Sequence, residues 1–121
     1  DDCGNVINHT IVEGQVHGAV AQGAGQIFGE QVVYDPDTGQ LLTGSFSDYY
    51  MPRAGLIPGI RMQDAPLPSP SNALGVKGVG ESGCIIGTAP IMNAMADALA
   101  PLGIRHLDMP YTAERVWAAS R

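Results

Sequence analysis

The distribution of glycine constrains this chain more than any other feature of its sequence. Glycine occurs 16 times among 121 residues, about twice its average usage in proteins. Nine of these glycines lie in two segments, 14–29 and 75–83, and they follow no collagen-like period. Because glycine has no side chain, such clusters indicate places where the backbone comes close to another group.

The first glycine-rich segment predicts an unusual helix over residues 13–30. Apolar and small residues recur at steps of three and four, namely Val12, Val16, Ala19, Gly23 and Ile27. Five glycines in this stretch oppose the helix by roughly 4 to 5 kcal/mol relative to alanine. Pattern and propensity therefore disagree, as is typical of functional or tightly packed sites.

A second stripe on the same predicted helix is uncharged and carries amide groups. Its members, Gln15, Gly18, Gln22 and Gly25 or Gln26, also recur at steps of three and four. Amide side chains and exposed backbone N–H groups can bind a polar heteroaromatic cofactor or its phosphate. Glycine on a helix face also lets another helix or strand pack closely, so both interpretations remain open.

The remainder of the chain predicts a mixture of strands and helices. We expect a hairpin with strands at 31–34 and 40–46 around a turn at 35–39, and further strands at 60–64 and 105–109. A helix over 88–100 begins at Thr88, because Pro90 fits only a first turn. Thr112 caps a last helix that ends at Ala119. These elements predict one α+β domain over 1–121, with two layers: a small mixed or antiparallel sheet, two main helices and a short C-terminal helix.

The second glycine-rich segment contains a candidate for chemistry. Residues 78–83 match the pattern G-x-G-x-x-G, but a proline-rich connector precedes them where a dinucleotide-binding fold requires a buried strand. Glu81 is the only carboxylate between Asp64 and Asp97. It is either a general base with space for a reacting group beside it, or a surface residue favoured by the dipole of the following helix.

Charge and composition exclude several classes of protein. The formal net charge is −6, and no cluster of Lys or Arg is present, which disfavours nucleic acid and anionic membranes as partners. We find no apolar run of membrane-spanning length, so we expect no membrane insertion and a cytoplasmic location. Cys3 and Cys84 are expected to be free thiols, and the histidines lack metal-ligand spacing. Lys77 either meets an anionic cofactor or is solvated, and we favour solvation.

Residues 8–25 and 75–83 together resemble the molybdenum hydroxylase family, the group that includes xanthine oxidase, aldehyde oxidoreductase and carbon monoxide dehydrogenase. The resemblance extends from Asp1 to Trp117 in the order of the last part of the molybdopterin-binding large subunit. It implies that Gln15 contacts the pterin, with Gly14, Gly18 and Gln22 shaping the same face. It also implies that Gly78, Val79 and Gly80 contribute to the cofactor site and that Glu81 is the catalytic base.

The resemblance further implies a larger assembly around this chain. The complete enzyme would contain the remainder of the large subunit, iron–sulfur and flavin subunits or domains, and molybdopterin in a cytosine dinucleotide form. Its substrate would be a small molecule: carbon monoxide, an aldehyde or an N-heterocycle. The sequences of residues 1–5 and 78–82 resemble the carbon monoxide dehydrogenase branch most. The chain alone would be inactive and would bind no cofactor tightly. The alternative is a non-catalytic interaction module or a stable fragment.

Overall fold

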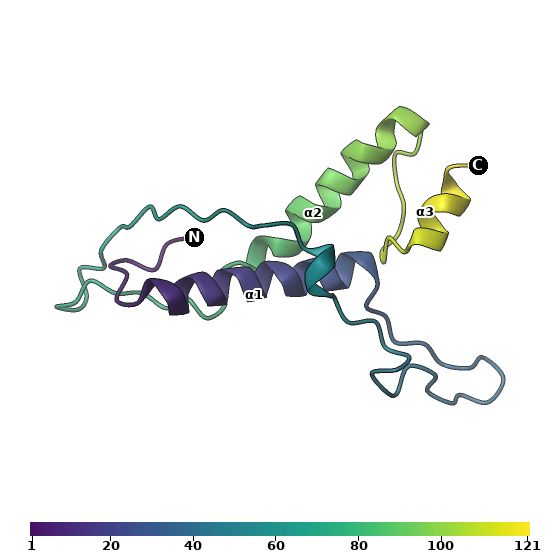
Figure 1. Cartoon of the computed structure of the whole chain (residues 1–121), viewed down its shortest axis with the longest axis horizontal. Helices are drawn as coiled ribbons and strands as arrows, with labels where there is room; N and C mark the ends of the chain where they lie inside the picture. Colours follow the sequence, from purple (N-terminus) through teal and green to yellow (C-terminus); the bar gives the residue numbers. More distant parts are fainter.

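A computed structural model describes all 121 residues and contains three α-helices. They are α1 (His9–Phe28), α2 (Cys84–Leu99) and α3 (Ala113–Ala119), with short 3-10 turns η1 (Ala54–Leu56) and η2 (Ala100–Leu102). In Figure 1, α2 rises from α1, and α3 lies beside the upper part of α2. Long loops connect these helices. Helices α1 and α2 pack against each other, and this pair organises the fold.

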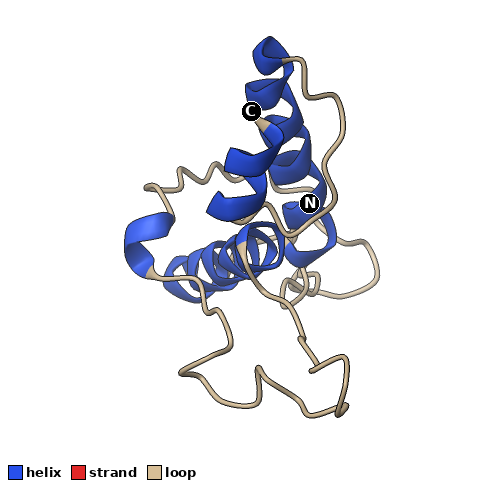
Figure 2. Cartoon of the chain, turned by 90° about the vertical axis from the view of Figure 1, so that its right-hand side faces the viewer, coloured by secondary structure: helices blue, strands red, loops and turns tan.

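The predicted α+β fold with a two-layer sheet is wrong. Figure 2 shows helices and loops without a strand, and only two isolated antiparallel bridges form, between Gly4 and Val76 and between Tyr34 and Leu41. The segments predicted as strands at 60–64 and 105–109 run as loops, because no neighbouring strand pairs with them. Short apolar alternation is compatible with a strand, but it supplies no partner for the backbone N–H and C=O groups.

The predicted hairpin is reduced to its turn. Asp35 accepts hydrogen bonds from the backbone N–H groups of Asp37 and Thr38, at 3.1 and 2.8 Å. Beyond the bridge, the Val33 N–H donates to the Thr43 hydroxyl, not to a backbone carbonyl. An isolated two-stranded hairpin is marginal in water, and here no third strand supports it. The segment 30–52 therefore extends away from the helices as an arm (Figure 1).

The helices themselves were largely predictable, although two of them begin early. Helix α1 begins four residues before the predicted start, because the Asn8 side chain accepts a hydrogen bond from the Ile11 N–H at 3.1 Å. Helix α2 begins at Cys84, so Thr88 lies inside it and Pro90 occupies its second turn. The prediction of α3 is confirmed, with Thr112 as its N-cap.

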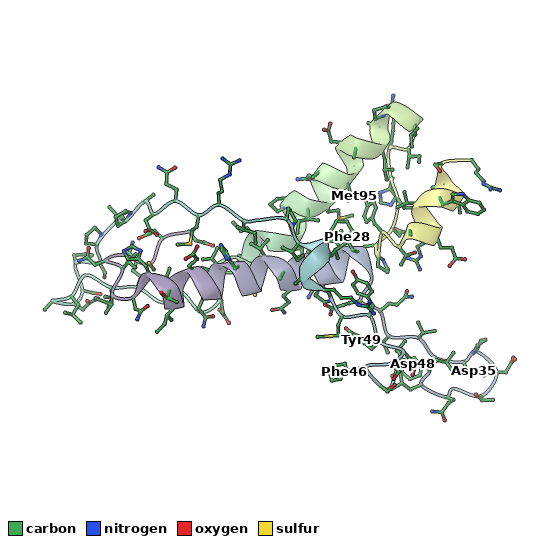
Figure 3. The ribbon with its side chains drawn as sticks, in the orientation of Figure 1. Phe28, Asp35, Phe46, Asp48, Tyr49 and Met95 are labelled. Carbon is green, nitrogen blue, oxygen red and sulfur yellow. The ribbon has the colours of Figure 1, made fainter.

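Glycine forms much of the interior. Thirteen residues are buried, and seven of them are glycines. Helices α1 and α2 cross where Gly23 meets Gly87, and a Cβ on Gly23 would lie 2.8 Å from the Gly87 carbonyl carbon. A small apolar cluster continues from this crossing and contains Ile27, Leu99 and Tyr111, with Phe28 and Met95 packed against it (Figure 3). Gly23 therefore serves close packing between helices, which is one of the two roles considered for glycine on this helix.

The fold leaves much apolar surface uncovered. Its accessible area is 8543 Å², whereas a compact monomer of 12.6 kDa exposes about 6,200 Å². Large apolar side chains are exposed on the arm, among them Val32, Tyr34 and Phe46. In Figure 3, Asp35, Phe46 and Asp48 mark how far the arm reaches from the helices. The chain therefore exposes surface that a self-contained domain of this mass would bury.

One segment meets the length and hydropathy criteria of a membrane span, contrary to the sequence expectation. It comprises Cys84–Leu102, 19 residues with a hydropathy of 1.3. The segment contains Pro90, Asn93 and Asp97, and α2 within it packs against α1. A single helix that meets these two criteria is weak support for membrane insertion.

Candidate functional site

The uncharged stripe predicted on α1 is exposed along most of its length, although Gly25 is buried. Gly14, Gln15, Gly18 and Gln22 are all exposed. A Cβ placed on Gly14 or Gly18 would meet no heavy atom within 4 Å. Neither glycine has a positive φ, so nothing within this chain requires glycine at these two positions. We call these four residues the amide face.

Glu81 lies in a tight turn that leads directly into α2. The Glu81 carbonyl accepts from the Cys84 N–H, and the Val79 carbonyl accepts from the Ser82 N–H, both at 3.1 Å. The Glu81 side chain is exposed and takes part in no hydrogen bond or ion pair. Gly78 and Gly80 also face open space at the position of a Cβ. Residues 78–83, hereafter the glutamate loop, therefore have an accessible carboxylate with space around it.

The structure packs Gly83 of the glutamate loop on α1 and brings Cys84, the first residue of α2, to one end of the amide face. Gly83, with φ of +89°, packs on α1 so closely that a Cβ there would lie 3.0 Å from the Ala19 Cβ. The Cys84 thiol donates to the Gln22 side-chain oxygen at 3.3 Å. Gln22 is thus joined to a residue three positions beyond Glu81. Gln15 and Gly14 lie further toward the N-terminus of α1 and have no recorded contact with the loop.

The N-terminal residues hold the glutamate loop from both sides. The Asp2 carboxylate pairs with the Lys77 ammonium at 2.9 Å, and the Asp1 carboxylate accepts from the Gly83 N–H at 3.2 Å. Backbone hydrogen bonds join Cys3 to Lys77 and Asn5 to Gly75, at 2.8 and 3.0 Å. The expectation that Lys77 is solvated is wrong, because its ammonium is paired with Asp2. The pairing could not be predicted, since the two residues are 75 positions apart in the sequence.

Electrostatics keeps this ion pair charged. The side-chain hydrogen bond from Lys77 and the backbone hydrogen bond from Gly4 lower the pKa of Asp2 below its ordinary value of 3.8. Both side chains are about two-thirds to three-quarters shielded from solvent. Asp2 is therefore an anion at every pH near neutrality, and its bonds to Lys77 and Gly4 persist there.

A groove lies beside the glutamate loop. Its volume is about 200 Å³, and Val12, Val16 and Val20 of α1 line it together with Val79 and Ile86. Ser82 and Gly83 also reach this groove, but no residue of the amide face does. Cys3 and Cys84 are free thiols, as expected. No group of three or more His, Cys, Asp or Glu residues is arranged to hold a metal ion.

Comparison with known proteins identifies the class to which this arrangement belongs. Residues 1–58 match the family model described as a molybdopterin cofactor-binding domain. The nicotine 6-hydroxylase large subunit of Paenarthrobacter nicotinovorans is 45% identical over all 121 residues. The carbon monoxide dehydrogenase large chain of Hydrogenophaga pseudoflava is 40% identical over 117 residues, or 97% of this chain.

Solved structures agree with the sequence matches. The crystal structure of quinoline 2-oxidoreductase from Pseudomonas putida 86 superposes with a TM-score of 0.88 and 43% identity, covering 98% of this chain. The chain is similar over nearly its whole length to one segment of the large subunits of the molybdenum hydroxylase family. It spans about 15% of the length of these relatives. Relatives named for nicotine and quinoline match at least as well as carbon monoxide dehydrogenase, so these identities do not favour the latter.

Proposed function

We propose that this chain forms one wall of the molybdopterin site of a molybdenum-dependent oxidoreductase, and that Glu81 is the catalytic base of that site. The observation that carries the proposal is the set of glycines with open space around them. Gly14 and Gly18 on α1, and Gly78 and Gly80 in the glutamate loop, pack against nothing within the chain. A glycine inside a helix costs about 1 kcal/mol relative to alanine, so Gly14 and Gly18 are best explained by a group outside this chain that lies close to the backbone.

The amide face suits a pterin and its attached phosphates. Gln15 and Gln22 each offer a side-chain oxygen that accepts and an NH₂ group that donates, which matches the mixed hydrogen-bonding edge of a pterin. The absence of side chains at Gly14 and Gly18 lets a flat ring system approach the helix backbone. By resemblance we assign the cytosine dinucleotide form to this cofactor. When bound, the cofactor supplies two-electron oxidation of the substrate.

Glu81 is placed to move a proton at the edge of that site. Its carboxylate is exposed and has no partner within the chain, so either oxygen is free to accept a proton from a reacting group. Gly78, Val79 and Gly80 bring the loop backbone close to the site without filling the space in front of the carboxylate. A positioned base of this kind contributes about 10² to 10⁴-fold to a reaction rate.

The uncovered surface supports the assignment to a larger assembly. The area that exceeds that of a compact monomer is about 2,300 Å², which is comparable to a stable protein interface. We propose that the remainder of the large subunit covers this surface, and that iron–sulfur and flavin partners carry electrons onward in the cytoplasm. The 121-residue chain alone then has no turnover and binds the cofactor weakly.

The replacement Glu81→Gln in the complete enzyme tests this function. It removes the proton acceptor while it keeps the size of the side chain, and no hydrogen bond of the fold involves the Glu81 side chain. We expect the turnover rate to fall by about 10² to 10⁴-fold with unchanged molybdenum and pterin content. The matched control is Glu114→Gln, at an exposed position on α3, which should retain full activity.

The opposite result would favour the alternative. Near-native turnover of the Glu81→Gln enzyme would show that Glu81 is not the base. A native large subunit without molybdenum, measured by metal analysis of the protein isolated with this chain, would indicate a non-catalytic interaction module.

A further inference from the structure

We infer that Asp2, Lys77 and Asp1 form a clamp that positions Glu81, so that residues at the start of this chain act on a loop 75 positions further along. The catalytic consequence of this clamp rests on the proposed function of Glu81. Its structural consequence, a glutamate loop held in one conformation, does not depend on that function.

The clamp acts at both ends of the glutamate loop. Lys77 immediately precedes the loop, and its ammonium donates to both Asp2 carboxylate oxygens, at 3.0 and 2.9 Å. Gly83 closes the loop, and its N–H donates to Asp1 at 3.2 Å. Asp2 is itself held, because its carboxylate also accepts from the Gly4 and Leu67 N–H groups at 2.9 and 3.2 Å. Residues 78–82, five in number, thus lie between two points, Lys77 and Gly83, that neighbouring aspartates hold.

The loop needs external support because its own contacts are few. Gly78 and Gly80 have wide backbone freedom and no neighbour at the position of a Cβ. The Glu81 side chain contacts no hydrogen-bonding partner, so its position depends on the backbone alone. Two turn hydrogen bonds, from the Ser82 and Cys84 N–H groups, order the backbone around Glu81, and the Gly83 carbonyl accepts from the Gly87 N–H at the start of α2. Small displacements of a catalytic group, of about 1 Å, can lower a rate by about 10²-fold.

The substitution Asp2→Asn in the complete enzyme tests the clamp. It removes the negative charge facing Lys77 and keeps the size of the side chain. We expect kcat to fall by about tenfold to a hundredfold, with KM changed by less than about twofold, because the base is misplaced while the bound substrate is not. Molybdenum content should not change. Hydrogen exchange of the backbone amides in residues 78–83 should accelerate by about tenfold, as expected when a segment opens locally.

Matched variants separate positioning from general damage. Asp37→Asn makes the same chemical change at an exposed position in the arm, and we expect native kcat and native exchange in residues 78–83. Lys77→Arg keeps the charge and should retain most of the activity. The exchanged pair Asp2→Lys with Lys77→Asp should recover part of the loop protection lost in either single variant. Native loop protection and native kcat in Asp2→Asn would overturn the clamp.

The clamp and the proposed function can fail separately. Faster exchange of residues 78–83 in Asp2→Asn, combined with full turnover in Glu81→Gln, would uphold the clamp and refute Glu81 as the base. Unchanged exchange in Asp2→Asn, combined with an inactive Glu81→Gln enzyme, would refute the clamp and uphold the base. If Asp2→Asn does not fold, the comparison of Lys77→Met with Lys77→Arg decides: equal loop protection in these two variants overturns the clamp.

Discussion

The crossing of α1 and α2 predicts that one substitution has opposite effects at two positions of the same helix. Replacing Gly23 by alanine places a methyl group 2.8 Å from the Gly87 carbonyl carbon and 3.1 Å from the Thr88 nitrogen. Both neighbours are backbone atoms, so no side chain can rotate away. The helices must separate by about 0.6 Å to reach the 3.4 Å at which ordinary contact begins. Gly18→Ala, five residues earlier, meets no atom within 4 Å.

The magnitudes follow from two opposing terms. Alanine favours a helix over glycine by about 1 kcal/mol, and this term alone applies to Gly18→Ala. Overpacking a close contact costs about 1 to 3 kcal/mol, so Gly23→Ala should lower the free energy of unfolding by up to about 2 kcal/mol after the helical gain. Gly18→Ala should raise it by up to about 1 kcal/mol in protein that lacks cofactor.

Urea unfolding of the large subunit without cofactor, followed at matched protein concentrations, measures both changes. The measurement compares midpoints at equal slopes, which separates a change in stability from a change in the unfolded state. If Gly23→Ala is as stable as the unsubstituted protein, the helices do not meet at Gly23 as described. If the stabilised Gly18→Ala protein also keeps its full cofactor content, the amide face does not contact the cofactor.

Two further predictions concern the N-cap of α1 and the charge of Asp2. Asn8→Ala removes the side-chain cap of α1 and should lower the free energy of unfolding by about 1 kcal/mol, whereas Asn93→Ala at an exposed position within α2 should have a smaller effect; equal losses in urea midpoints would exclude a capping role. Because the folded pKa of Asp2 lies below 3.8, its stabilising contribution is complete above that pH and is lost as the pH falls from there through the lowered value. The stability difference between the unsubstituted protein and Asp2→Asn should therefore be constant from pH 7 to about 5 and should shrink in stronger acid; a difference that grows on acidification would contradict the assignment.

The sequence predicted the parts of this fold that depend on local signals. Thr112 specified the start of α3, and the spacing of Val16, Ala19 and Gly23 specified which side of α1 faces the rest of the chain. Both signals act within a few residues, through capping and helical periodicity. The sequence alone misplaces the start of α2, because Pro90 favours a start at Thr88, whereas packing of Gly87 against α1 extends the helix by an earlier turn.

The sheet could not be excluded from the sequence, because strands depend on partners distant in the chain. Residues 31–34 and 40–46 have the composition of strands and even meet at one bridge, yet nothing lies beside them to continue the ladder. The same limitation applied to the site. Glu81 and the amide face were predicted as separate features, but their approach through Gly83 and Ala19, and the pairing of Asp2 with Lys77, are tertiary contacts that no local pattern encodes.

The glycine-rich interior has a consequence for how stability varies with temperature. Gly23 and Gly87, which meet where α1 and α2 cross, contribute no side chain, so this contact removes little apolar area from water. The heat capacity of unfolding rises by about 0.45 cal/mol/K for each Å² of apolar surface exposed. The enthalpy of separating these helices should therefore depend only weakly on temperature. We therefore expect a flat stability curve for this helix pair, which should loosen little on cooling, where cores held by hydrophobic burial weaken.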